Sequence, residues 1–274
     1  MTIQLPQELI EVIIDHLADD STSLKACSLV CRAWVCRSRR HLYKHITLLV
    51  RNILALRELL QSPWCTLLPH VSSIEAIRHE EDPDDGGFDD VAVDLHRLVE
   101  TRRLNVKLNI RRIRPTPSDP PKFVRAGGFL TAFPNVTNLV LGSNKGQQLM
   151  SLIEIIRLFP ALQELDVRQL SGTFLEHTVD AVPPLGLRSV RLSRDSVRTV
   201  LVWLQAFNRL HNVDSLSLAS VKLPLDPTVR TALKQLGGSL RHLDLDVLVR
   251  PFASALDLSL YLELKEISIR SKIH

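Results

Sequence analysis

The spacing of apolar residues changes along the chain, from a helical period near the N-terminus to a strand period further on. After Pro6, apolar side chains recur every three or four residues over 9–17, which is typical of an amphipathic helix. The polar run at 19–23 ends this pattern and supplies N-cap candidates for a second helix, expected from Leu24 to Trp34. A third short helix is expected over 37–43. So small a unit buries little apolar surface, so part of its apolar arc should contact the rest of the chain or another protein.

From residue 136 onward, the pattern apolar-x-x-apolar-x-apolar occurs six times. Its fourth position is occupied by Leu139, Leu165, Val190, Leu216, Leu243 and Ile267. The steps between these residues are 26, 25, 26, 27 and 24 positions, within the period of leucine-rich repeats, in which each unit supplies a strand. Weaker strand patterns occur at 71–76 and 104–110, and 45–48 is predicted as the initial strand.

Between the strong strands the apolar period becomes helical. Helices are predicted over 148–159, 196–210 and 227–236, with Asp195 and Asp226 as N-cap candidates. The stretch 171–183 is expected to hold only a short helix or an irregular turn. Units of strand, turn and helix with this period stack into a curved α/β solenoid with a parallel sheet on its inner face.

The residues between the apolar positions of each strand point to the opposite face of the sheet, because side chains alternate along a strand. Asn138 and Val140 are the first of these outward residues, and nearly all the others are polar. A sheet buried on both faces would instead show unbroken apolar runs. We therefore expect an open concave face that binds a target protein, although a merely solvated sheet would show the same polarity. Its candidate binding residues are Glu164, Asp166, Arg168, Arg191, Ser217, His242, Asp244 and Arg270.

Composition narrows the class of protein. The 274 residues are 45% hydrophobic and 23% charged, which argues against extensive disorder, and the net charge of +4 is a weak argument for nucleic acid. No run reaches the roughly 18 apolar residues of a membrane span. Glu8 and Glu11 lie where a signal peptide would carry basic residues, so we expect an intracellular protein of the cytoplasm or nucleus, away from membranes. Three of the four cysteines fall within 27–36, a spacing that favours reduced thiols over disulfides or zinc.

Charged residues cluster in the region of the weaker strands. Eight carboxylates fall within 80–94, which we interpret as an exposed loop, and seven basic residues follow within 97–114. A proline-rich loop is predicted over 115–121. The two charged stretches either neutralise each other on a solvated surface or bind a partner.

No catalytic signature is present. The G-x-S-x-G and H-E-x-x-H motifs do not occur, and Gly142 to Gly146 lacks the spacing of a phosphate-binding loop. His41 and His45 are spaced as metal ligands on a helix could be, but no further ligand is placed to complete a site. We therefore expect neither a metal nor a cofactor, and no enzymatic activity.

The first 47 residues resemble an F-box. The resemblance covers residues 3–47 and rests on LPxEL at 5–9, SLVCRAW at 28–34 and Leu42-Tyr43. It implies a three-helix module that docks on the Skp-family adaptor of a cullin–RING ubiquitin ligase. The matching positions are Leu5, Pro6, Leu9, Ile10, Ile13, Leu29, Val30 and Trp34. Spacing does not tell which of them contact the adaptor and which hold the helices together, and an N-terminal helical hairpin that caps the rest stays an alternative.

The later repeats resemble the degenerate leucine-rich repeats of fungal F-box proteins, because Phe-Pro precedes the strands at 136–141 and 162–167. The expected fold is therefore α/β, with an F-box at 1–47 and a leucine-rich-repeat-like solenoid at 48–274. Little chain follows Ile269, so the solenoid is truncated, divergent or capped by its own tail.

These resemblances imply a substrate-recognition adaptor of an SCF-type ubiquitin ligase, bound through the Skp-family adaptor to a cullin and selecting an unidentified target protein. Two alternatives stay open. One is a repeat scaffold that is not coupled to ubiquitination. The other is a nucleic-acid or ligand binder that uses the basic stretch at 97–114.

Overall fold

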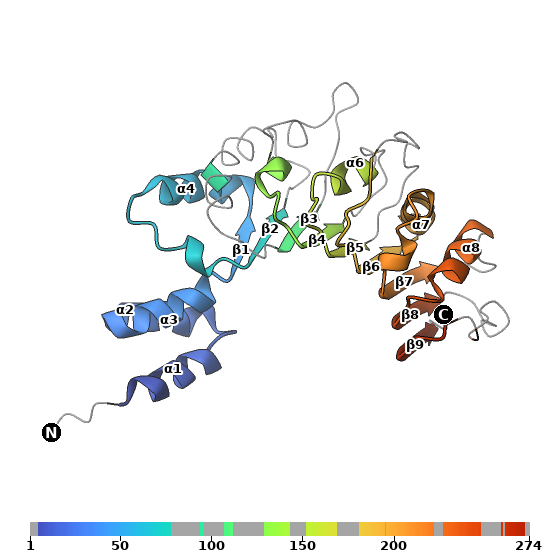
Figure 1. Ribbon diagram of the computed structural model, residues 1–274. Coiled ribbons are helices and arrows are strands. Elements are labelled where there is room, and N and C mark those ends of the chain that lie inside the picture. Colours follow the sequence, from blue (N-terminus) through green and yellow to red (C-terminus); the bar gives the residue numbers. More distant parts are fainter. Residues whose placement is uncertain are drawn as a thin grey trace.

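The computed structural model shows a mixed α/β protein (Figure 1). The described residues are 5–77, 94–95, 107–111, 129–142, 152–168, 181–194, 196–221, 227–247, 259 and 261–271. The α-helices are α1 (Gln7–His16), α2 (Ser21–Val30), α3 (Arg32–Leu42), α4 (Val50–Gln61), α6 (Leu152–Ile156), α7 (Ser196–Ala206) and α8 (Pro227–Leu236). Short 3-10 helices are η1 (Leu68–His70), η3 (Phe129–Ala132) and η4 (Leu210–Asn212).

The strands form one parallel sheet in the order of the sequence. They are β1 (His45–Leu48), β2 (Ser73–Ile77), β3 (Lys107–Arg111), β4 (Asn138–Gly142), β5 (Glu164–Arg168), β6 (Ser189–Ser193), β7 (Ser215–Val221), β8 (His242–Val247) and β9 (Glu266–Ser271). The six repeat positions from Leu139 to Ile267 pair with one another across successive strands. Ile46, Ile74 and Leu108 continue the same row upstream. The predicted strands, including the weaker early ones, are confirmed.

The repeat also appears in the backbone at the start of the strands. The carbonyl of Thr137 accepts hydrogen bonds from the N–H groups of Gln163 and Glu164, both at 2.8 Å. The carbonyls of Lys44, Gln163, Arg188, Asp214 and Arg241 each accept two N–H groups from the following unit in the same way. These shared acceptors satisfy backbone donors where each strand enters the sheet, and they fix the stagger between neighbouring units.

One apolar core runs between the sheet and the helices. Helices α4, α6, α7 and α8 lie on the outer side of the arc of strands, and the inner side is free of the described helices (Figure 1). Phe133 and Phe159, which precede the strands β4 and β5, are fully buried in this core. In these two units a large aromatic side chain therefore fills the core on the side where the chain enters the sheet.

The predicted helices of the repeats are confirmed in part. Helix α8 has the predicted bounds, and α6 lies inside the predicted range 148–159. Helix α7 ends at Ala206, four residues before the predicted end at 210, because Asn208 adopts a left-handed backbone conformation (φ 53°) that a helix cannot continue through. Asp195 and Asp226 and most of the stretch 171–183 lie outside the described residues.

The three helices at the N-terminus form what we call the head (residues 5–44). The second helix was predicted to reach Trp34, which is wrong. Cys31 is extended (φ −160°, ψ 166°), so α2 stops at Val30 and Trp34 belongs to α3. Of the N-cap candidates in the polar run 19–23, Asp20 is the one that caps α2: its Oδ1 accepts hydrogen bonds from Thr22 N and Ser23 N, both at 3.1 Å.

The head is joined to the strands through α3. Both α1 and α2 pack against α3, and α3 contacts η1 at the start of the sheet region. The Arg39 guanidinium donates a hydrogen bond to Thr66 Oγ1 at 2.6 Å. Figure 1 shows the head at one end of the arc and β9 at the other. No helix among the residues described in the structure is long and apolar enough to cross a bilayer.

Candidate functional site

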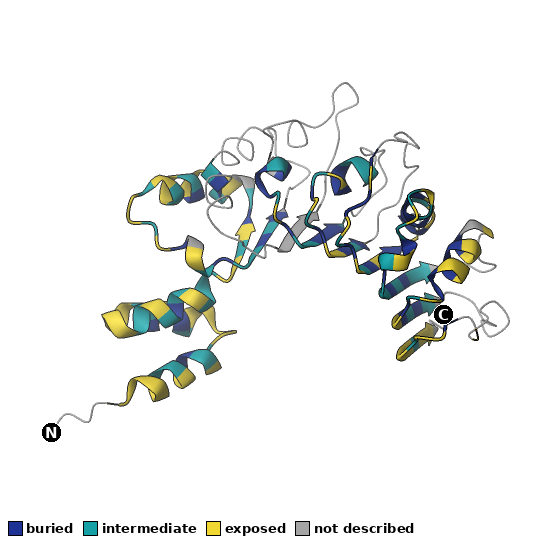
Figure 2. Cartoon of the chain, in the orientation of Figure 1, coloured by how far each residue is buried: buried dark blue, intermediate teal, exposed yellow. Residues whose placement is uncertain are grey.

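The head presents apolar side chains to solvent. Leu29 is 86% exposed, Val30 61% and Leu9 50%, and the remaining exposed residues of the predicted set are Leu5, Pro6 and Ile13. Figure 2 shows this exposure over α1 and α2. We call these six residues the apolar face of the head. Exposed large apolar side chains clustered on one small module are typical of protein interaction sites.

The structure separates this face from the interior of the head. Ile14, Leu24 and Cys27 are buried and hold the three helices together, and none of them is among the eight predicted docking positions. The other two predicted positions, Ile10 and Trp34, are half-buried. Val12 is also exposed and was missed by sequence reasoning, because the F-box resemblance does not include it.

A polar cluster fixes α1 on α3. The carboxylate of Asp15 accepts hydrogen bonds from Arg37 Nε at 2.6 Å and from Arg37 Nη2, and it lies 2.7 Å from His41 Nε2. Glu11 adds a longer ion pair to Arg37 at 3.8 Å. The hydrogen bonds from Arg37 and then His41 hold the pKa of Asp15 well below its usual range. The hydrogen bond from Asp15 likewise raises the pKa of Arg37.

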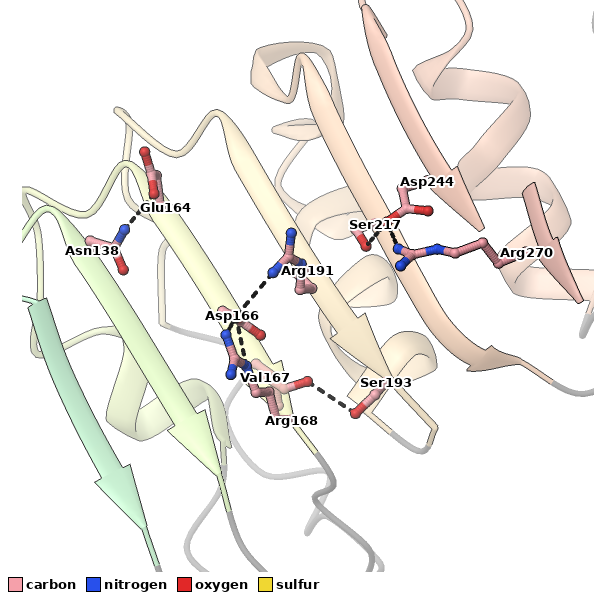
Figure 3. A network of polar contacts seen from close by, with 10 residues as sticks. All are labelled: Asn138, Glu164, Asp166, Val167, Arg168, Arg191, Ser193, Ser217, Asp244 and Arg270. Atoms are coloured by element: carbon pink, nitrogen blue, oxygen red, sulfur yellow. Dashed lines mark hydrogen bonds and ion pairs between the residues drawn. The ribbon is translucent and has the colours of Figure 1, made fainter. Parts of the chain in front are cut away.

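The sheet face opposite the outer helices carries the second candidate surface, which we call the concave face. Register places Asp166, Arg191, Ser217 and Asp244 side by side in one row across β5 to β8. Glu164 and His242 belong to the neighbouring row. Every predicted candidate of this face therefore lies on the predicted side of the sheet, and Figure 3 shows most of them.

Two acidic residues organise the polar contacts of the concave face. Asp166 Oδ2 accepts hydrogen bonds from Arg168 at 2.6 and 2.9 Å and lies 3.6 Å from Arg191 Nη1 (Figure 3). The hydrogen bond to Asp166 raises the pKa of Arg168. Asp244 Oδ2 accepts hydrogen bonds from Ser217 Oγ at 3.2 Å and Arg270 Nη2 at 2.5 Å. Each acid is thus shared between neighbouring basic or hydroxyl groups.

One end of the predicted face is less open than expected. Val140 was assigned to the outward row, but only 3% of it is exposed. Its neighbour in the row, Asp166, has a side chain that is only 14% exposed. The outward row is therefore largely covered at Val140 and Asp166.

A further polar hollow, which sequence reasoning missed, lies where the chain enters β6 to β9. It has a volume of about 530 Å³, and its lining includes Arg188, His211, Asp214, Arg241 and Glu263. Arg188, Asp214 and Arg241 directly precede β6, β7 and β8, so the hollow follows the repeat and could have been found from it. Its charges are mixed, which gives it no clear preference for a ligand of either sign.

The charged stretches contribute little to the described surface. The acidic loop 80–94 lies outside the described residues apart from Asp94, whose carboxylate accepts a hydrogen bond from Gln61 at 3.1 Å. The basic stretch 97–114 is described only as strand β3, and the proline-rich loop is not described.

The described residues contain no candidate metal site. No group of three metal-ligating side chains occurs among the described residues, and His41 contacts Asp15 instead of His45. All four cysteines are free thiols. Cys27 is buried and Cys65 half-buried, whereas Cys31 and Cys36 are exposed.

Comparison with known proteins adds no relative. No protein-family model matches the chain, and no curated protein matches it with significant similarity. The two surfaces that bear on function are the apolar face of the head and the concave face.

Proposed function

We propose that this chain is a substrate-recognition adaptor of an SCF-type ubiquitin ligase. In this proposal the head is an F-box that docks on a Skp-family adaptor and, through it, a cullin. The strands and outer helices form a leucine-rich-repeat-like solenoid, and its concave face binds a target protein. The chain contributes proximity and orientation of the target, while bond formation takes place on other subunits.

The apolar face of the head is the observation that carries the proposal. Six of the eight positions that match an F-box are exposed, although all but Pro6 are large apolar residues. Exposing them to water is unfavourable, at about 25 cal/mol per Å² of apolar surface, and a partner that covers them recovers this free energy. The helices do not need these side chains for their own packing, because Ile14, Leu24 and Cys27 fill the interior.

The concave face supports the second half of the proposal. It offers alternating acidic, basic and hydroxyl groups on a regular lattice of strands, from Asp166 on β5 to Arg270 on β9. Because these groups are anchored on strands of one continuous sheet, they are held in place before a target arrives, which lowers the entropic cost of binding.

The direct test is titration of the purified chain with a purified Skp-family adaptor by calorimetry. We expect a one-to-one complex, and Leu9→Asp or Leu29→Asp should weaken it at least tenfold because each places a charge in the buried interface. Leu54→Asp is the matched control: Leu54 is 59% exposed on α4, away from the head, and its variant should bind as the wild type does. Absence of binding, or equal affinity of all variants, would contradict the proposal.

Coupling to ubiquitination needs a separate measurement. Purification of the tagged chain from cells should recover a cullin together with the Skp-family adaptor. Recovery of the adaptor without a cullin would instead favour a scaffold that is not coupled to ubiquitination. Variants of the concave face such as Asp244→Ala should leave both subunits bound, since Asp244 lies on β8 at the far end of the arc from the head.

A further inference from the structure

The last strand of the sheet exposes apolar residues that earlier strands bury. Among the described residues, β9 pairs with β8 on one side and with no strand on the other. Ile267 is 39% exposed and Ile269 49%, whereas Leu243 and Leu245, at the same positions of β8, are each 2% exposed. A strand with a free edge also presents backbone N–H and C=O groups that can pair with another strand.

The side chains of β9 are arranged symmetrically about its centre. Ser268 is the midpoint, and Ile267 and Ile269 flank it on the side of the core. Glu266 and Arg270 lie two residues away in either direction, on the concave face, with side chains 75% and 69% exposed. If the strand is reversed about Ser268, Ile267 and Ile269 exchange places on the apolar side. On the polar side, Glu266 and Arg270 exchange places.

We propose that a second copy of this chain docks on the free edge of β9, with the two β9 strands antiparallel and a two-fold axis at Ser268. Glu266 then lies opposite Arg270 of the second copy, and Ile267 lies opposite Ile269 of the second copy. Residues directly opposite each other in an antiparallel pair share one face of the sheet, so both pairings form on the correct side. The same patch is used by both copies, and the assembly closes as a dimer.

Geometry selects this arrangement over a parallel one. A second copy that offers the same edge of β9 as a parallel strand must be turned over, which would place its Ile267 and Ile269 on the same side of the sheet as Glu266 and Arg270 of the first copy. The existing contacts suit the antiparallel dimer. Arg270 is held by Asp244 and Glu266 lies 3.4 Å from His242, so in the dimer Arg270 would lie between two carboxylates and Glu266 between an imidazole and a guanidinium.

The dimer should be weak and should leave the heads free. A pair of short strands covers less than the roughly 1,200 Å² typical of stable interfaces, so the dimer forms only at high protein concentration. The heads lie at the far ends of the two arcs (Figure 1). Dimer formation therefore does not depend on the proposed docking of the head, and the two proposals fail or succeed separately.

Sedimentation equilibrium of the full chain tests the dimer. Over about 1 to 300 µM, a range set by the expected weak affinity, the mass-average molar mass should rise from monomer toward dimer. Glu266→Arg and Arg270→Glu should each remain monomeric, because like charges then face each other, while their equimolar mixture should dimerise as the wild type does. Glu263→Arg, which makes the same charge change just before β9, is the matched control and should still dimerise.

A variant that keeps both Glu266 and Arg270 tests the apolar side of the proposed dimer interface. Ile269→Thr keeps a β-branched residue on the strand and should reduce dimerisation at least fivefold without unfolding the protein, as checked by circular dichroism. A wild-type chain that stays monomeric over the whole range would overturn the proposal. So would single charge variants that dimerise normally, or folded variants whose mixture stays monomeric.

Discussion

The head and the strand array, residues 45–271, place their apolar side chains in opposite ways. In the array, Leu, Val, Ile and Phe fill one continuous core, and the repeat positions from Leu139 to Leu243 are at most 2% exposed. In the head, Leu9, Leu29 and Val30 are at least half exposed. Figure 2 shows the contrast along the chain.

This difference shows that the two regions obtain their stability from different sources. The array stacks unit on unit, so each layer buries the apolar side of its neighbour, and the free energy of folding is supplied within the chain. The head keeps only a small interior around Ile14, Leu24 and Cys27 and relies on polar contacts such as Asp15 with Arg37. Its apolar face is therefore available for a partner. Variants in the core of the array should act on stability, and variants of the apolar face should act on binding.

The largest loss of stability is expected from the core of the array. Phe159→Ala removes a fully buried ring that closes the unit before β5, and it should lower the free energy of unfolding by about 3–5 kcal/mol. Urea denaturation followed by circular dichroism measures this loss. Leu59→Ala on α4, at a residue that is 53% exposed, is the control and should change it by less than about 0.5 kcal/mol. Equal losses in both variants would mean that the buried core of the array does not supply its stability.

A smaller loss is expected from a buried hydrogen bond at the start of α7. The Ser196 hydroxyl donates to the carbonyl of Ser193 at 2.8 Å and accepts from the Ser193 N–H at 3.2 Å. Ser196→Ala removes both of these hydrogen bonds from the buried interior and should lower the free energy of unfolding by about 1–2 kcal/mol. Thermal denaturation compared with Ser189→Ala, on the half-buried edge of the concave face, provides the measurement. A wild-type melting temperature for Ser196→Ala would show that the contact contributes nothing.

Acid should weaken the attachment of α1. The pKa of Asp15 is lower in the folded chain than its ordinary value of 3.8, so protonation favours the unfolded state. The contribution of Asp15 is complete above that ordinary value and is lost as the pH falls through the lower folded pKa. Asp15→Asn should therefore be less stable than wild type at neutral pH, with the gap closing below about pH 4.

Urea denaturation at several pH values measures this gap. Asp19→Asn, which changes an exposed residue in the turn after α1, is the control and should follow the wild type at neutral pH. A gap between Asp15→Asn and wild type that stays constant down to pH about 2.5 would argue against the ion pair as its cause.

The smallest effect is expected on the concave face. Arg191 is 55% exposed and lies 3.6 Å from Asp166, and exposed ion pairs contribute little because water and salt screen them. Arg191→Ala should change the free energy of unfolding by less than about 0.5 kcal/mol, measured by urea denaturation. A loss above about 1 kcal/mol would mean that the face is needed for folding and is less free for a target than proposed.

Much of the array followed from its periodicity. A frame of alternating apolar residues that returns every 24 to 27 positions leaves few ways to stack, so the order, direction and register of β4 to β9 could be predicted. Helix α4 was not predicted, although Ile53, Leu56 and Leu60 have helical spacing. The break at Cys31 was missed because apolar spacing continues across it and no glycine or proline marks it.

The sequence by itself determined the local pattern: where strands and most helices lie, which side of each strand is apolar, and that the polar run 19–23 caps the second helix. These features depend on neighbours in the chain, which the sequence displays directly. Only the tertiary structure decided which apolar residues of the head meet water, that Val140 is covered, and that Ile267 and Ile269 lie on a free edge. Burial is decided by residues that are distant in sequence, since a side chain is removed from water by whatever the fold brings against it.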